Sequence, residues 1–391
     1  MQTLFPIYFK KIVIMNAYKY YFFFVFVLLF FSCSENNDNY SSSSDNYNRQ
    51  ALLDNLVSNI IIPAHANHMQ HLNDLQSNIN NFISDKTISN LQTVRSSFID
   101  SYLAWQHIEM FNIGYAEEIF YARKMNIYPT NNITIENNIQ DLEYDLDNDP
   151  YQYSAQGYPA IDYMIYGLGD GDEEILEKYL LDSSNVTYTN YLNDLIINMV
   201  ANSQSVIEYW SSNSSNFINS TANTASSSLN MLVNDFVYYY EKGLRANKIG
   251  IPAGYWSGLL PQNVEALYKQ DISKALAMEA LTACHNFFLG RHFESNETVG
   301  EGLYDYLAYL DDTNYSDSQM FIGLEDDIVD AFDNSMQKLE LLNDNFVTQI
   351  NTDNLKMLEA FDAIQVGVVR LKTNMMSILG ISVDYFDADG D

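Results

Sequence analysis

The sequence predicts an all-α protein, and three observations lead to this prediction. From Ala51 onward apolar residues recur every three or four positions, whereas a half-buried strand would alternate apolar and polar side chains. The 391 residues include only 16 Gly and 7 Pro, below the average usage of about 7% and 5%. Hydrophobic residues make up 47% of the chain and aromatic residues 14%, which is enough for a sizeable core. A Gly-rich β fold and a largely disordered chain are therefore disfavoured.

The clearest single helix is expected at 89–111. Its apolar residues advance by three or four, which places them on one face that should lie in the core. These residues are Leu91, Val94, Phe98, Tyr102, Trp105 and Ile108. The other expected helices are 50–83 with a kink at Pro63, 186–211, 224–243, 263–289, 322–345 and 352–379, the last capped by Gly380.

Polar stretches rich in Asn, Asp, Gly and Pro separate these helices. They predict loops at 126–159, 167–173, 212–220, 245–262 and 290–300. The Ser- and Asn-rich stretch at 211–220 is the best candidate boundary between domains. We therefore expect an N-terminal helical bundle at 49–215 and a C-terminal helical bundle at 216–391.

The first 32 residues read as a secretory signal peptide. They hold three lysines and no acid, followed by an apolar run at 21–31 that is too short to span about 30 Å of hydrocarbon. Ser32 and Cys33 follow, and this arrangement resembles a bacterial lipobox, which predicts lipidation of Cys33. Residues 33–48 are expected to form a flexible tether. We expect an exported outer-membrane lipoprotein that faces the periplasm or the cell surface and contacts the membrane through its lipid anchor only.

The charge of the chain limits its partners. The formal net charge is -32, and removal of three leader lysines makes the mature chain -35. Such a negative field repels phosphate backbones, so nucleic acid is excluded as a partner. The sequence has 2 cysteines, and lipidation of Cys33 would leave Cys284 without a partner for an internal disulfide.

Several short motifs occur in a characteristic order along the chain. They are Ala104-Trp105-Gln106 with Glu109 and Gly114; Arg123 with Asn126 and Tyr128-Pro129; Gly157 to Gly167; Leu244-Arg245 with Lys248 to Pro252; and Pro261 with Val264-Glu265-Ala266. Together they resemble the imelysin family, also called the imelysin-like or M75 peptidase family of bacterial envelope proteins. The resemblance implies two four-helix bundles with a cleft between them, and a link to the acquisition of iron or other metals.

The family signature Gly-x-His-x-x-Glu lies over Gly157, Pro159 and Asp162 in this chain. A His and a carboxylate three residues apart share a helical face and can bind one metal ion. Pro159 removes the histidine, and Asp162 alone cannot hold a catalytic zinc. Asp162 is the remaining metal-ligand candidate, and a structural role in a polar core pair is equally favoured. Peptidase activity is disfavoured, although the question of catalysis stays open at this point.

The candidate ligand-binding residues all belong to the family motifs. Their charged side chains and one aromatic ring could together line a polar cleft with an aromatic wall. They are Trp105, Glu109, Arg123, Asp162, Arg245 and Lys248. The expected ligand is a metal ion or a small anion, the candidate cofactor is a divalent metal or iron, and the candidate partners are outer-membrane uptake components. A salt-bridge network that holds the two bundles together is an equally weighted alternative. The predicted function is a non-catalytic binding component; the alternatives are an M75-type metal-dependent peptidase and a surface scaffold or adhesin.

Other motifs favour structural roles. His65, His68 and His71 are expected as an exposed stripe on a helix rather than a metal site. The segment 167–174 resembles a phosphate loop, but its acids favour a turn that caps a helix. His107, Cys284 and His285 are assigned to packing. The final residues 387–391 resemble the beginning of a calcium loop, but the bidentate Glu is missing, so a solvated acidic tail is favoured.

Overall fold

The computed structural model describes residues 45–180, 185–313 and 321–385. The predicted signal peptide, Cys33, most of the tether and the acidic residues 387–391 lie outside the described residues. From Tyr47 onward the chain forms one compact unit. Within the described ranges the regular structure is helical, and the only β pairing is an isolated bridge between Arg291 and Val299. The predicted all-α fold class is confirmed, and the division into bundles at 49–215 and 216–391, with a cleft between them, stays a prediction.

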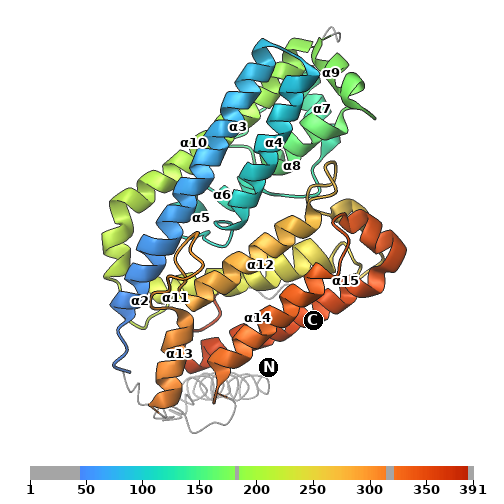
Figure 1. The fold of residues 1–391 in the computed structure, drawn as a ribbon. Helices are drawn as coiled ribbons and strands as arrows, with labels where there is room; N and C mark the ends of the chain where they lie inside the picture. Colours follow the sequence, from blue (N-terminus) through green and yellow to red (C-terminus); the bar gives the residue numbers. More distant parts are fainter. Residues whose placement is uncertain (1–44, 181–184, 314–320, 386–391) are drawn as a thin grey trace, which may run out of the picture. The chain divides into compact units, whose positions relative to one another are not determined.

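The N-terminal part begins with a long helical segment at 49–84 (Figure 1). It consists of α2 (Arg49–Asn55), the π-helical stretch η1 (Leu56–Ile61) and α3 (Ile62–Ser84). Pro63 is the second residue of α3, two positions after the end of η1. A proline cannot donate the helical i to i−4 hydrogen bond, and the hydrogen-bond pattern changes just before it. The kink predicted at Pro63 stays a prediction, and the deviation from α-helical hydrogen bonding is the π-helical segment η1 before it.

α3 packs against two further long helices, α4 (Ile88–Gln106) and α10 (Asn185–Ile218), which lie beside it in Figure 1. Thr87 caps α4 because its hydroxyl accepts the N–H of Asn90 at 3.2 Å. The apolar face predicted for this helix is confirmed, since Leu91, Val94, Phe98, Tyr102 and Trp105 are all 0% exposed.

His65 and His68 correct the prediction of an exposed histidine stripe, because they are 2% and 0% exposed. The packing of α3 between α4 and α10 covers this face of the helix. His68 Nε2 lies 2.8 Å from the Tyr158 hydroxyl. Burial lowers the pKa of both histidines to about 3, so they are neutral core residues.

Short helices connect α4 to α10. They are α5 (Tyr115–Glu118), α6 (Tyr121–Met125), α7 (Asn132–Asp141), η2 (Pro150–Ala155), α8 (Gly157–Asp162), η3 (Tyr163–Gly167) and α9 (Asp172–Leu180). The predicted loop at 126–159 is therefore wrong over α7, η2 and the start of α8. The segment 168–171 is a turn that leads into α9, as predicted, and Glu174 accepts the N–H of Asp170 there.

The second half follows α10. Its elements are α11 (Ser228–Tyr238), η4 (Tyr239–Gly250), η5 (Pro261–Asn263), α12 (Ser273–Leu289), α13 (Leu303–Asp312), α14 (Leu324–Glu340), α15 (Phe346–Val368), η6 (Val369–Met375) and α16 (Met376–Ile378). α15 packs on both α14 and η4. The predicted loop at 212–220 is wrong up to residue 218, because α10 continues to Ile218. None of the helices in the described ranges combines the length and apolar character needed to cross a membrane.

Candidate functional site

The segment that carries the family signature begins at a left-handed glycine. Gly157 has φ of 73°, and a Cβ at this position would lie 2.2 Å from the backbone oxygen of Met125. Both the backbone conformation and the close contact therefore require glycine here. Pro159 and Asp162 follow in α8, and both are buried. The first position of the signature thus has a structural explanation that does not depend on a ligand.

Asp162 binds backbone amides. Its Oδ2 accepts the N–H of Tyr268 at 2.8 Å, and its Oδ1 accepts the N–H of Lys269 at 2.9 Å. Burial raises the pKa of Asp162 to about 7, although these two hydrogen bonds and the Lys269 charge act in the opposite direction. The carboxylate therefore fixes the turn at 266–270 against α8, and both of its oxygens already have donors.

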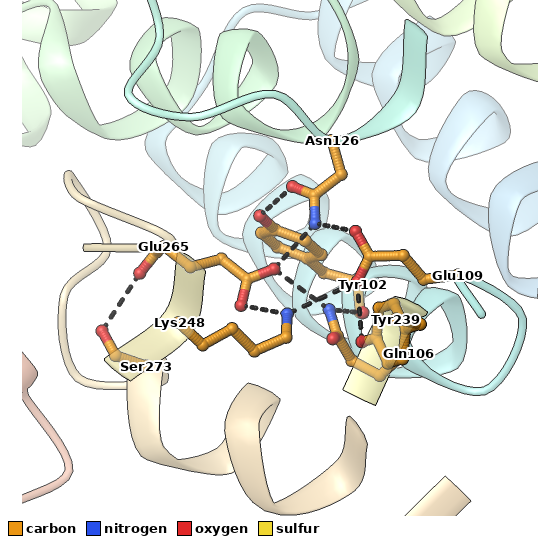
Figure 2. Close-up of polar contacts among 8 residues, drawn as sticks. All are labelled: Tyr102, Gln106, Glu109, Asn126, Tyr239, Lys248, Glu265 and Ser273. Carbon is orange, nitrogen blue, oxygen red and sulfur yellow. Dashed lines mark hydrogen bonds and ion pairs between the residues drawn. The ribbon is translucent and has the colours of Figure 1, made fainter. Parts of the chain in front are cut away.

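A second polar group, which we call the Lys248 cluster, lies in the interior and is drawn in Figure 2. Its members are Tyr102, Gln106, Glu109, Asn126, Tyr239, Lys248, Glu265 and Ser273. Lys248 Nζ lies 2.6 Å from Glu265 Oε2 and 3.5 Å from Glu109 Oε2. Burial alone would lower the pKa of Lys248, but the charges of Glu265 and Glu109 outweigh it and the pKa is raised. Lys248 is therefore a buried ammonium between two carboxylates.

Asn126 completes the connections within the Lys248 cluster. Its Nδ2 donates to Glu109 Oε1 and to Glu265 Oε1, both at 2.8 Å, and its Oδ1 accepts the Tyr102 hydroxyl at 2.6 Å. Tyr239 donates to Glu109 Oε2 at 2.9 Å. These contacts join α4, the residue after α6, η4 and the segment after η5. Because the cluster contains one ammonium and two carboxylates that accept several hydrogen bonds, it stabilises the packing of these segments.

Arg245 also lies in η4 but belongs to a different network of contacts. It is 3% exposed, donates to the Gln365 side chain and stacks on the rings of Trp256 and Phe361, with its guanidinium carbon 5.5 and 5.3 Å from the ring centroids. Its guanidinium also lies 3.7 Å from the Glu241 carboxylate. Arg245 therefore fixes η4 to α15 rather than lining a common site with Lys248.

Trp105 and Arg123 lie in two further environments. Trp105 is 0% exposed and packs edge-on against Tyr121 at 5.2 Å, so it is a core residue. Arg123 is exposed, with its guanidinium 5.7 Å from the Phe120 ring centroid, and it lines a surface cavity of about 360 Å³. Among the six predicted binding residues, the structure brings Glu109 and Lys248 into direct contact and distributes the others over separate places.

Glu265 and Asn126 were not predicted as site residues. Both stand within the family motifs quoted above, and each is buried, at 2% and 8% exposure. For Glu265 the available signal was a carboxylate between the apolar residues Val264 and Ala266, since buried polar side chains need partners. Within the described part of the chain there is no group of three His, Cys, Asp or Glu side chains placed to hold a metal ion.

The chain has recognisable relatives. The family model described as Imelysin matches residues 61–365, whereas no curated protein matches the chain. An imelysin-like protein from Psychrobacter arcticum 273-4 is similar in structure, with a TM-score of 0.66, 17% identity, and coverage of 86% of this chain and 97% of that chain. A protein from Parabacteroides distasonis ATCC 8503 described as an iron-regulated protein A precursor has a TM-score of 0.69 and 14% identity, and covers 85% of this chain and 95% of its own.

Because both sequence identities are low, the two structural similarities support the fold alone. The family match extends over most of the residues that the structure describes. The chain therefore belongs to the imelysin family.

Proposed function

We propose that this chain is a non-catalytic binding component of the bacterial envelope that serves the uptake of iron or another metal. Membership in the imelysin family and the structural similarity to a protein described as iron-regulated support the link to metal uptake. The proposal that the chain is not a catalyst depends on the hydrogen bonding of Asp162, because both of its carboxylate oxygens accept backbone N–H groups.

A metal-dependent peptidase has different requirements. Catalytic zinc sites combine three protein ligands with an open position for water, and a nearby base activates that water. In this chain Pro159 stands where the signature has histidine, and the Asp162 carboxylate already has two donors. In the Lys248 cluster the carboxylates of Glu109 and Glu265 surround an ammonium group. These carboxylates are suited to hold the fold together, which argues against a catalytic metal site in this cluster.

The proposed location rests on the N-terminal sequence. A signal peptide at 1–32, lipidation of Cys33 and a tether at 33–48 would anchor the folded part at the outer membrane, facing the periplasm or the cell surface. Metal ions, small anionic ligands and outer-membrane uptake components are the proposed partners. The high negative charge of the chain, -32, would attract cations to its surface.

Uptake of radioactive iron tests this proposal. A host strain that lacks the chain should accumulate less ⁵⁵Fe from iron-poor medium than the parent strain, and the wild-type chain supplied from a plasmid should restore accumulation. Parallel uptake of ⁶⁵Zn, with the same strains, shows whether another metal is the cargo. Unchanged accumulation of both metals would overturn the proposed role and favour a scaffold or adhesin.

A further inference from the structure

The segment 251–260, which follows η4, carries large apolar side chains at the surface. We call it the aromatic loop. Tyr255, Trp256 and Leu259 are 46%, 44% and 52% exposed, whereas the other two tryptophans of the chain, Trp105 and Trp210, are 0% and 1% exposed. A single apolar residue on a surface is common, but three large ones within five positions form the kind of patch that binds a partner.

The backbone of the aromatic loop has a fixed conformation. Gly254 has φ of 72°, and a Cβ there would lie 2.7 Å from the backbone of Gly258, so the loop turns at a position that requires glycine. Asn354 of α15 donates its Nδ2 to the backbone oxygen of Ala253 at 3.0 Å. The loop is therefore attached to α15, and the fold determines which of its side chains reach the surface.

The two rings of the aromatic loop pack on a third ring. Tyr255 stacks on Phe361 of α15 with centroids 3.8 Å apart, and Trp256 meets the same ring edge-on at 5.3 Å. The Arg245 guanidinium carbon lies 5.5 Å from the Trp256 centroid. Because these contacts restrict the rings before any partner binds, little side-chain entropy is lost when a partner covers them.

Charge is absent from this part of the sequence. No Asp, Glu, Lys, Arg or His stands between Lys248 and Glu265, although charged residues make up 18% of the chain and its net charge is -32. The ring of Tyr151, which is 88% exposed, is by contrast two residues from Asp149. Transfer of a charge into an apolar phase is costly, so the aromatic loop is better suited to enter such a phase than the surface around Tyr151.

The expected lipid anchor would bring such a phase within reach. The folded part begins at Tyr47, whose ring stacks on Tyr306 of α13 at 4.2 Å, and 14 peptide units link Tyr47 to Cys33. Fully extended, these units span about 50 Å, which exceeds the radius of gyration of about 20 Å expected for a compact unit of this length. The tether therefore allows the aromatic loop to meet a bilayer that holds Cys33, and the anchor would keep the loop at a high effective concentration there.

We propose that the aromatic loop inserts into the interface of a zwitterionic phospholipid bilayer, with Tyr255 and Trp256 among the headgroups and Leu259 at the acyl chains. Tyr and Trp concentrate at this depth because each combines an apolar ring with a polar group. Zwitterionic lipid is the expected surface, because the negative charge of the chain opposes approach to anionic lipid. The proposal rests on the membrane location proposed above, and it adds a second contact to the lipid anchor, which the sequence alone predicted as the only one.

Tryptophan fluorescence of the chain on vesicles tests the proposal. The purified mature chain without lipid is coupled through the Cys33 thiol to maleimide lipids in phosphatidylcholine vesicles, and Cys284 does not compete because it is buried. Acyl chains that carry bromine quench tryptophans that enter the bilayer. Since Trp256 is the exposed tryptophan, emission should be weaker on brominated than on ordinary vesicles, and on both it should lie at shorter wavelength than in buffer.

The chemical coupling separates this test from the function proposed above. The result does not depend on whether cells attach lipid to Cys33, nor on whether the chain takes part in metal uptake. Loss of metal uptake in the absence of quenching would reject the bilayer contact alone, and quenching without any effect on uptake would reject the uptake role alone.

A variant that keeps Trp256 as the reporter identifies the contact. Leu259→Asp places a carboxylate in the aromatic loop and should abolish the quenching, because the charge would have to leave water. Ile133→Asp is the matched control, since Ile133 of α7 is 70% exposed and lies outside the loop; quenching in this variant should equal that of the wild type. Circular dichroism should show that both variants keep the wild-type helicity.

Three results would overturn the proposal. The first is equal emission of the wild type on brominated and ordinary vesicles, and the second is equal quenching in the wild type and Leu259→Asp. The third is a shift to shorter wavelength that appears only at high density of coupled chain and without quenching, which would show that the aromatic loop contacts a second copy instead of lipid.

Discussion

Replacement of Lys248 by methionine should destabilise the fold strongly. The Lys248 side chain is 2% exposed and lies between Glu265, whose side chain is 3% exposed, and Glu109. Methionine fills a similar volume but leaves two carboxylates facing each other without a positive charge. Removal of one partner of a buried ion pair costs about 3–5 kcal/mol, which is a large part of the roughly 5–15 kcal/mol that stabilises a typical protein.

Urea denaturation followed by circular dichroism measures this loss. The matched control is Lys338→Met, because Lys338 lies 3.0 Å from Glu359 in a pair whose side chains are 36% and 45% exposed. Such a surface pair contributes about 0–1 kcal/mol. The double variant Lys248→Met/Glu265→Gln should recover much of the stability, since it removes one of the two opposed charges. If Lys248→Met costs no more than Lys338→Met, the Lys248 cluster does not hold these segments together.

Three further predictions follow from individual residues. Burial lowers the pKa of His65 to about 3, so below about pH 6.5 the folded chain binds fewer protons than the unfolded chain and its stability should decrease. His65→Leu should abolish roughly 2 kcal/mol of the stability that the wild type loses between pH 7 and pH 5, as measured by urea denaturation. An unchanged loss in this variant would contradict the assignment of His65 as a neutral core residue. Gly157→Ala should lower the thermal midpoint by several degrees because its Cβ would meet Met125, while Gly171→Ala, where a Cβ meets nothing within 4 Å, should leave it nearly unchanged. Cys33→Ser should abolish incorporation of radiolabelled palmitate, and equal labelling of variant and wild type would reject the lipid anchor.

Periodicity predicted the fold class because the buried face of an amphipathic helix requires apolar residues at every third or fourth position of the sequence. The face of α4 is an example, since every residue placed on it up to Trp105 is buried. α7 was missed because Asn132–Asp141 contains few apolar residues. Asn131 caps this helix, since its side chain accepts the Thr134 N–H at 3.1 Å. The exposed histidine stripe was wrong because α3 is covered on two sides, by α4 and α10, and a single helix pattern does not show how many neighbours surround it.

The candidate site was only partly predictable for a related reason. Glu109 and Lys248 were predicted from motifs far apart in the sequence, and the structure places them 3.5 Å apart. Glu265 is the closer partner of Lys248, at 2.6 Å, and was missed because its position depends on how the segment after η5 packs. Local sequence also gave no sign that backbone amides of Tyr268 and Lys269 would bind Asp162.

Digestion of a peptide library by the purified chain is the most direct test of the claim that this imelysin-family protein binds without catalysing. The reaction is run with added zinc or ferrous iron, with and without EDTA, and the peptides are identified by mass spectrometry. Because Pro159 replaces the signature histidine and Asp162 is held by two backbone amides, the peptides should be the same as those in buffer alone. Cleavage at defined positions that EDTA abolishes would contradict the account and establish an M75-type peptidase.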